Sequence, residues 1–185
     1  MRDNGWYVSN VTITLVVNGY VDAIYYRFDN GSWIEYTEPF FATISEDGFH
    51  TFYWRYWYQG NLSDVYQIDF KIDQTVPTIT LSQERIALNK VKITANVSDE
   101  TSGINRVKFR DGWNEHTDYT SPYEVIFLGF GIHMVTATVY DNAGNIAVSK
   151  IITPCSQSIS SYQSQISSSS QQLTQSIQLV KTISK

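Results

Sequence analysis

The sequence contains an internal repeat, and this repeat limits the possible folds more than any other feature. Residues 11–17 return as residues 91–97, and Gly60-Asn61 returns as Gly144-Asn145. The matches between them keep their order while the offset drifts only from 80 to 84, as short loop insertions would cause. A repeat of this length predicts two copies of one small domain. The other matched pairs are Tyr26-Arg27-Phe28-Asp29 with Val107-Lys108-Phe109-Arg110, Trp33 with Trp113, Pro39-Phe40 with Pro122-Tyr123, and Gly48-Phe49-His50 with Gly131-Ile132-His133.

The composition is that of a chain that folds around a core. Of 185 residues, 42% are hydrophobic and 17% are charged, and no apolar run approaches the roughly 18 to 20 residues that a membrane span requires. The net charge of -5 argues against a nucleic-acid partner, which would normally leave a basic surface. The single Cys155 excludes a disulfide within the chain and a metal site built from several cysteines.

Each copy contains short segments of alternating polarity, separated by turn residues such as Asn30-Gly31 and Asp111-Gly112, and this predicts an all-β fold. Alternate residues of a strand point to one face, which gives the expected inward sets. In the matched strands these sets are Val11, Ile13, Leu15 and Val17 in the first copy, and Val91, Ile93, Ala95 and Val97 in the second. The predicted strands are 11–17, 23–29, 40–45, 50–58 and 64–72, and then 77–82, 90–98, 104–110, 123–128, 132–141 and 146–153.

Three segments carry a resemblance to a known family: Asp73-x-x-x-Pro77, Ser98-Asp99-Glu100-Thr101-Ser102-Gly103-Ile104 and Tyr140-Asp141-Asn142-Ala143-Gly144-Asn145. With them, the chain resembles the tandem immunoglobulin-like (fibronectin-III-like) repeats of bacterial and archaeal cell-surface proteins. The resemblance implies two immunoglobulin-like β-sandwiches, repeat 1 in residues 1–73 and repeat 2 in residues 74–154, followed by a tail in residues 155–185. It leaves the function open, because such modules serve as spacers, stalks, adhesins and enzyme appendages.

Repeat 1 departs from this pattern in two places. Gly60-Asn61 follows Tyr58-Gln59, whereas the matching hairpin of repeat 2 has Asp141 in front of it. Repeat 1 also lacks a full counterpart of the predicted strand 77–82, so the neighbouring strand should keep an unpaired edge that something else covers. We therefore expect the chain to be a piece of a longer exported array.

The tail has a different composition, with 11 Ser and seven Gln between Ser156 and Lys185. This composition indicates a flexible linker or stalk. A three-four spacing instead indicates one face of a helix that could dock on a sandwich or self-associate as a coiled coil. Both interpretations remain open from the sequence. The spaced residues are Ile159, Tyr162, Ile166, Ser169, Leu173, Ser176, Val180 and Ile183.

Residues suited to catalysis are scarce, and we expect no enzyme. Two of the three histidines, His50 and His133, occupy matching positions in the two copies, which favours a structural role for both. The third, His116, has no counterpart. The sequence contains no glycine-rich phosphate loop, zinc-binding histidine pair on a helix or nucleophile elbow.

Calcium is the one cofactor that the sequence suggests. In a tandem sandwich, the loop at Asp99 and Glu100 and the hairpin at Asp141 lie at the end where the chain enters, close to Asp73 of the linker. Carboxylate oxygens suit Ca²⁺, which takes six to eight oxygen ligands. The alternative is that these residues only form Asx turns.

The chain contains 27 aromatic residues, of which 19 lie in repeat 1. Strand parity places part of this surplus on an outer sheet surface, with Phe52, Trp54 and Tyr56 inward. Aromatic rings and arginines on a flat surface suit a protein partner or sugar stacking, and cover by the tail or a neighbouring repeat is the alternative. The predicted outward residues are Tyr25, Arg27, Tyr53, Arg55 and Trp57, where repeat 2 shows Lys108, Thr136, Thr138 and Tyr140.

These observations favour a structural and adhesive module that spaces or presents a partner-binding face outside the cell. The alternative function is a carbohydrate-binding accessory module of a larger secreted enzyme. Four glycosylation sequons, which begin at Asn10, Asn30, Asn61 and Asn96, are compatible with an extracellular location.

Overall fold

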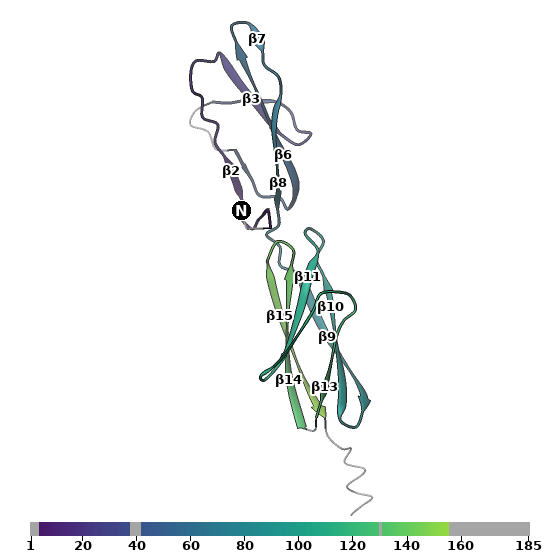
Figure 1. The fold of residues 1–185 in the computed structure, drawn as a ribbon. Coiled ribbons are helices and arrows are strands. Elements are labelled where there is room, and N and C mark those ends of the chain that lie inside the picture. Colours follow the sequence, from purple (N-terminus) through teal and green to yellow (C-terminus); the bar gives the residue numbers. More distant parts are fainter. Residues whose placement is uncertain (1–3, 38–41, 130, 156–185) are drawn as a thin grey trace, which may run out of the picture.

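The computed structural model describes residues 4–37, 42–129 and 131–155, and all the regular elements in these ranges are β-strands. They form two layered bodies that lie end to end, repeat 1 and repeat 2 (Figure 1). No helix in the described ranges is long and apolar enough to cross a membrane. The expected helix or stalk of the tail lies outside the described residues.

Repeat 1 pairs one large sheet with one small sheet. The large sheet has the order β1-β8-β6-β3-β4, with β7 beside β6, and the small sheet contains only β2 and β5. All its pairs are antiparallel except β1 with β8, which is parallel. The strands are β1 (Trp6–Tyr7), β2 (Val11–Ile13), β3 (Ala23–Phe28), β4 (Ile34–Glu35), β5 (Ala42–Ile44), β6 (Gly48–Tyr58), β7 (Asn61–Leu62) and β8 (Tyr66–Ile72).

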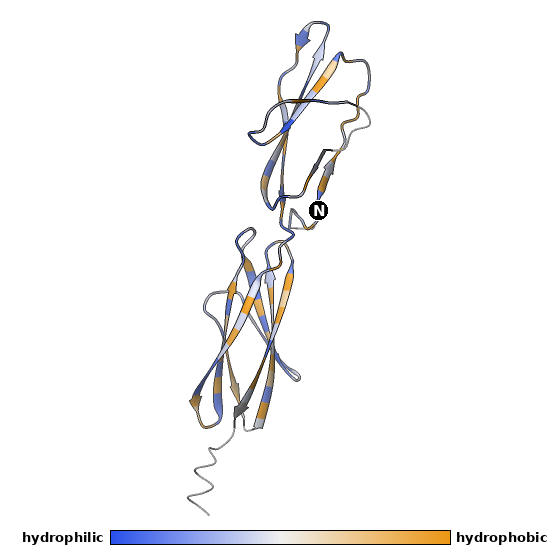
Figure 2. Cartoon of the chain, turned by 180° about the vertical axis from the view of Figure 1, so that it is seen from behind, coloured by the Kyte–Doolittle hydropathy of each residue, from blue (hydrophilic) through white to orange (hydrophobic). Residues whose placement is uncertain are grey.

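Repeat 2 is a sandwich of a three-stranded sheet, β13-β10-β9, and a four-stranded sheet, β12-β11-β14-β15. Hydrophobic and hydrophilic residues alternate along its strands, as a sheet with one buried face requires (Figure 2). The strands are β9 (Thr78–Ala87), β10 (Lys90–Ser98), β11 (Ile104–Asp111), β12 (Asn114–Asp118), β13 (Tyr123–Leu128), β14 (Gly131–Asp141) and β15 (Ile146–Cys155).

The two cores differ in the size of their side chains. Val135, Ala137 and Val139 on β14 are fully buried between the sheets of repeat 2. The matching strand of repeat 1, β6, buries Phe52 instead, and this ring stacks on Tyr26 with 5.8 Å between ring centroids. Trp54 continues the cluster at 5.8 Å from Phe52. Part of the aromatic surplus therefore fills the core of repeat 1, as predicted.

The register corrects one of the sequence matches. In repeat 1, Tyr26 on β3 pairs with Trp54 on β6. In repeat 2, the residue of β11 that pairs with Ala137 on β14 is Phe109 and not Val107. If Trp54 matches Ala137, then Tyr26 matches Phe109, two residues beyond the expected partner. An error of two residues preserves the face of a strand, so the inward and outward assignments remain valid.

The first predicted strand of repeat 1 is also shorter than expected. β2 ends at Ile13, and Val17 is 41% exposed rather than buried. Leu15 still packs against the core, although it lies in a loop. Four short strands, β1, β4, β7 and β12, were not predicted, because two to five residues without regular alternation carry little periodic signal.

Repeat 1 has an incomplete second sheet in the part that the structure describes. In repeat 2, the ten-residue strand β9 pairs with β10 and also lies against β15. Among the described residues, no strand pairs with β2 on the side away from β5. Ile68 on the facing strand β8 is consequently 53% exposed. Among the strands that the structure describes, none from one copy shares a sheet with a strand of the other, and the boundaries 1–73 and 74–154 stay a prediction.

Candidate functional site

The outer surface of the large sheet in repeat 1, which we call the aromatic face, holds the five residues predicted for partner binding. Across β3 and β6, Tyr25 lies opposite Arg55, Arg27 opposite Tyr53, and Ala23 opposite Trp57. Directly paired residues share a face. The buried Tyr26 and Phe52 alternate with them along the same strands and mark the opposite, inner surface.

Four of the side chains on the aromatic face form a continuous stack. The guanidinium carbon of Arg27 lies 4.5 Å from the ring centroid of Tyr53 and 5.2 Å from that of Trp33. The guanidinium of Arg55 lies 4.1 Å from the same Trp33 ring. The order is thus Tyr53, Arg27, Trp33, Arg55, with each cation against a ring face that attracts it. The Nε atoms of both arginines are buried without a hydrogen-bond partner in the described part of the chain.

Trp33 was not among the predicted site residues. It precedes β4 and folds back over the two arginines, which a strand-parity argument cannot detect. The only signal in the sequence was its match to Trp113 of repeat 2, yet Trp113 is 97% exposed. Trp57, by contrast, is 39% exposed and is not one of the four side chains of the stack.

The equivalent surface of repeat 2 is built differently. Lys108 pairs with Glu115 at 2.7 Å, and the guanidinium of Arg106 covers the ring of Tyr140 at 3.9 Å. On β14, Thr138 lies opposite Lys108 and Thr136 lies opposite Arg110. This surface is polar and carries the small side chains that the sequence predicted.

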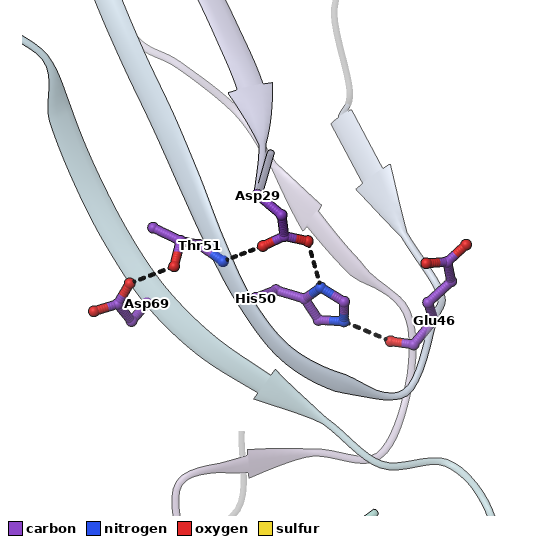
Figure 3. A network of polar contacts seen from close by, with 5 residues as sticks. All are labelled: Asp29, Glu46, His50, Thr51 and Asp69. Atoms are coloured by element: carbon purple, nitrogen blue, oxygen red, sulfur yellow. Dashed lines mark hydrogen bonds and ion pairs between the residues drawn. The ribbon is translucent and has the colours of Figure 1, made fainter. Parts of the chain in front are cut away.

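The two matching histidines have matching carboxylate partners. His50 Nδ1 lies 3.0 Å from Asp29 Oδ2, and Nε2 lies 2.9 Å from the Glu46 carbonyl oxygen, both within hydrogen-bond distance (Figure 3). The amide of Thr51 donates to the other Asp29 oxygen at 2.7 Å. In repeat 2, His133 Nδ1 bonds to Asp111 Oδ2 in the same way. Both nitrogens of His50 are engaged, which supports a structural role for this ring.

The Asp29 carboxyl shows how this network affects ionisation. Partial burial alone would raise the pKa of Asp29. The hydrogen bonds from His50 and the Thr51 amide, together with the charge of His50, outweigh burial and hold the pKa below its ordinary value of 3.8.

The acidic junction is the cluster of Asp73, Asp99 and Asp141 where the linker enters repeat 2. One carboxylate oxygen from each of the three residues lies within 4.8 Å of the other two. Asp73 follows β8, Asp99 follows β10, and Asp141 ends β14, so the ends of three strands bring them together. Glu100, the fourth predicted ligand, is exposed and does not belong to the cluster, because consecutive residues point in different directions.

Each carboxylate of the acidic junction is held by backbone amides through one oxygen. Asp141 Oδ1 accepts from the amides of Gly144 and Asn145, and Asp99 Oδ1 accepts from Ser102 and Gly103. These are the Asx turns that the sequence offered as the alternative to metal binding.

Burial raises the pKa of Asp73 above its ordinary value of 3.8. The charges of Asp99 and Asp141 raise it further, while the nearby Ser102 hydroxyl and the amide of Thr75 offset part of the effect. The cluster therefore concentrates negative charge in a place with little water.

An open groove lies on the inner surface of repeat 1, where the small sheet stops. Its volume is about 780 Å³, and its walls include Leu15, Ile24, Trp54, Tyr56 and Tyr66. Tyr56 and Tyr66 are stacked on each other with 6.3 Å between centroids. Tyr56, predicted to point inward, thus lines a groove rather than a closed core.

Comparisons with known proteins return solved structures only. No protein-family model and no curated protein matches the chain. A structure of fibronectin(III)-like modules of Clostridium thermocellum CbhA has 20% sequence identity and a TM-score of 0.42, covering 82% of this chain and 88% of its own. The FN1–FN3 domains of chicken CNTN1 have 11% identity and a TM-score of 0.36, covering 81% of this chain and 62% of theirs. Because both TM-scores are low, the assignment of an all-β sandwich fold rests on the strand order described above.

Proposed function

We propose that the chain is a non-catalytic extracellular module in which repeat 2 acts as a spacer and the aromatic face of repeat 1 contacts a partner. The observation that carries this proposal is the stack of Tyr53, Arg27, Trp33 and Arg55 on an outer sheet surface. Repeat 2 has the same kind of fold with a single arginine–tyrosine contact, Arg106 on Tyr140, on the matching surface, so the fold does not require a stack of four side chains.

The stack supports contact with a partner because the rings hold the two arginines in place before binding occurs. Arginine side chains lose much conformational entropy when an interface immobilises them, and a stack that already holds them lowers this cost. Tyrosine, tryptophan and arginine are also the residues that dominate binding hot spots. Trp57, beside the stack and partly exposed, supplies a ring that a partner can cover.

A protein partner is the main candidate, and two variants test it. Tyr53→Ala removes one end of the stack and should lower the stability of the fold. Trp57→Ala leaves the stack intact, so it should unfold cooperatively like the wild type while binding weakens by about tenfold or more. If Trp57→Ala binds a protein-coated surface as well as the wild type does, the aromatic face is not the contact surface.

A carbohydrate partner is the second candidate, and the groove of repeat 1 favours it. Aromatic side chains with polar edges, such as those of Trp54, Tyr56 and Tyr66, line many ligand pockets. A glycan array separates the two candidates. Glycan binding that persists in Trp57→Ala and is lost in Tyr66→Ala would assign the groove to a sugar, and absence of binding on the array would exclude the glycans tested.

A further inference from the structure

We propose that Asp73, Asp99 and Asp141 of the acidic junction bind a Ca²⁺ ion that fastens the linker to the end of repeat 2. This inference is independent of the proposed function of the aromatic face. The three carboxylates come from three separate strand ends, and one oxygen of each lies within 4.8 Å of the others.

The strongest support is that two buried carboxylate oxygens have no hydrogen-bond partner. Asp73 is 0% exposed and Asp141 is 3% exposed. In the described part of the chain, Oδ2 of each is buried without a hydrogen-bond partner of good geometry, and the Ser102 hydroxyl is the donor that lies near the Asp73 carboxyl. A buried charged oxygen without a partner carries a large desolvation cost, so native proteins almost always pair it or bind it to a metal.

The hydrogen bonds also orient the carboxylates for an ion. Backbone amides hold Asp141 and Asp99 through Oδ1, which leaves the second oxygen of each free to coordinate. Thr75 does the same for Asp73, with its amide donating to Oδ1 at 3.2 Å. The Asx turns are therefore compatible with metal binding, because the turns use one oxygen and an ion would use the other.

The ligand set favours calcium over magnesium. Two oxygens that both bind Ca²⁺ at about 2.3–2.6 Å can lie up to about 5 Å apart, and the oxygens of the acidic junction lie within 4.8 Å of one another. Magnesium keeps several waters and seldom uses three protein carboxylates. Asp99 is only half-buried, which leaves a route for the ion and for water ligands that complete the shell.

An ion in this position would act on the junction between the repeats. Asp73 follows directly after β8 of repeat 1, while Asp99 and Asp141 belong to repeat 2. The side chain of Asn145 already bonds the carbonyls of Asp73 and Thr75 at 2.9 and 3.1 Å. The side chain of Asn4 bonds the carbonyl of Asn142 across the same junction. Calcium would add bonds between a charged linker residue and two loops of repeat 2.

The test is calorimetric titration of the full chain with CaCl₂ after removal of metals by EDTA. We expect one ion per chain and a melting temperature that is higher in calcium than in EDTA. Hydrogen exchange should slow at the amides that donate to the three carboxylates. Absence of binding at millimolar calcium, or MgCl₂ binding as tightly as CaCl₂, would overturn the assignment.

Two neighbouring acidic residues supply a matched pair of variants. Asp99→Asn keeps an oxygen for the amides of Ser102 and Gly103 but loses the charge, so calcium affinity should fall by about tenfold or more. Glu100→Gln removes the adjacent exposed carboxylate, and its affinity should equal that of the wild type. Equal calcium affinity in the two variants would show that the cluster is not the site.

Discussion

Trp33 and Trp113 occupy matching sequence positions in the two repeats but have different surroundings. The Trp33 ring contacts the guanidinium groups of both Arg27 and Arg55, whereas Trp113 is 97% exposed. A ring that contacts two cations gains about 0.5–1 kcal/mol from each contact, in addition to the apolar area that it buries. The same residue type is therefore structural in one repeat and free in the other.

This contrast gives a prediction with a built-in control. Trp33→Ala should lower the free energy of unfolding by about 1–3 kcal/mol, because it removes two cation–π contacts and exposes both arginines. Trp113→Ala should change it by less than about 0.5 kcal/mol. Urea unfolding followed by tryptophan fluorescence and circular dichroism measures both. Equal losses in the two variants would contradict a stabilising stack.

A second prediction at the residue scale concerns pH. Asp29 has a lowered pKa in the folded protein, so its interactions stabilise the fold fully above the unfolded pKa of 3.8. This contribution should disappear as the pH falls below 3.8 through the lower folded value. The Asp29→Asn variant has no carboxyl to titrate at this position and therefore lacks this pH-dependent contribution. Its unfolding midpoint in urea should depend less steeply on pH between about pH 5 and 2 than that of the wild type. Parallel pH profiles for the two proteins would contradict the role of the His50 network.

At the scale of elements, the missing strand in the described part of repeat 1 explains its uneven packing. In repeat 1, Ile68 on β8 pairs with Phe52 on β6. In repeat 2, Ile151 on β15 pairs with Val135 on β14, so the two isoleucines occupy equivalent positions. Ile151 packs against the core of repeat 2, where β9 covers β15, whereas Ile68 is 53% exposed. Equivalent strands thus differ in burial because one has a neighbour in the second sheet.

The difference should appear in stability. Ile151→Ala should lower the free energy of unfolding by about 2 kcal/mol or more, because it leaves a cavity among packed side chains. Ile68→Ala should cost about 1 kcal/mol or less, since much of that side chain is already in water. A loss of stability at Ile68→Ala that is larger than about 1 kcal/mol would contradict this, because it would mean that other residues pack over Ile68 in solution.

The elements also show what the sequence could and could not predict. Long alternating segments such as β10 and β14 were placed within a residue or two, because period-two patterning is read directly from the chain. The matched pair of Tyr26 with Val107 was two residues out of register, an error to which polarity patterns are insensitive. Trp33 was missed because a loop, and not a strand, carries it onto the sheet.

At the scale of the whole molecule, two copies of one fold have different surfaces and a shared junction. Sequence order placed Asp73, Asp99 and Asp141 at one end of a sandwich, and the structure brings all three together. The sequence could not exclude Glu100 as a ligand, because the directions of adjacent side chains in a loop depend on backbone geometry that the sequence does not reveal. The aromatic face was predictable as a surface, but the stacking of its rings on arginine was not.

The central claim is that the aromatic face of repeat 1 contacts a partner, and adhesion of protein-coated beads tests it most directly. Beads that carry wild-type chain, Trp57→Ala or Trp113→Ala are compared on cells and on purified extracellular protein surfaces, after unfolding curves establish that both variants are folded. We expect Trp57→Ala beads to lose most of their adhesion and Trp113→Ala beads to adhere like the wild type. Undiminished adhesion by Trp57→Ala beads, or an equal loss in both variants, would contradict the claim.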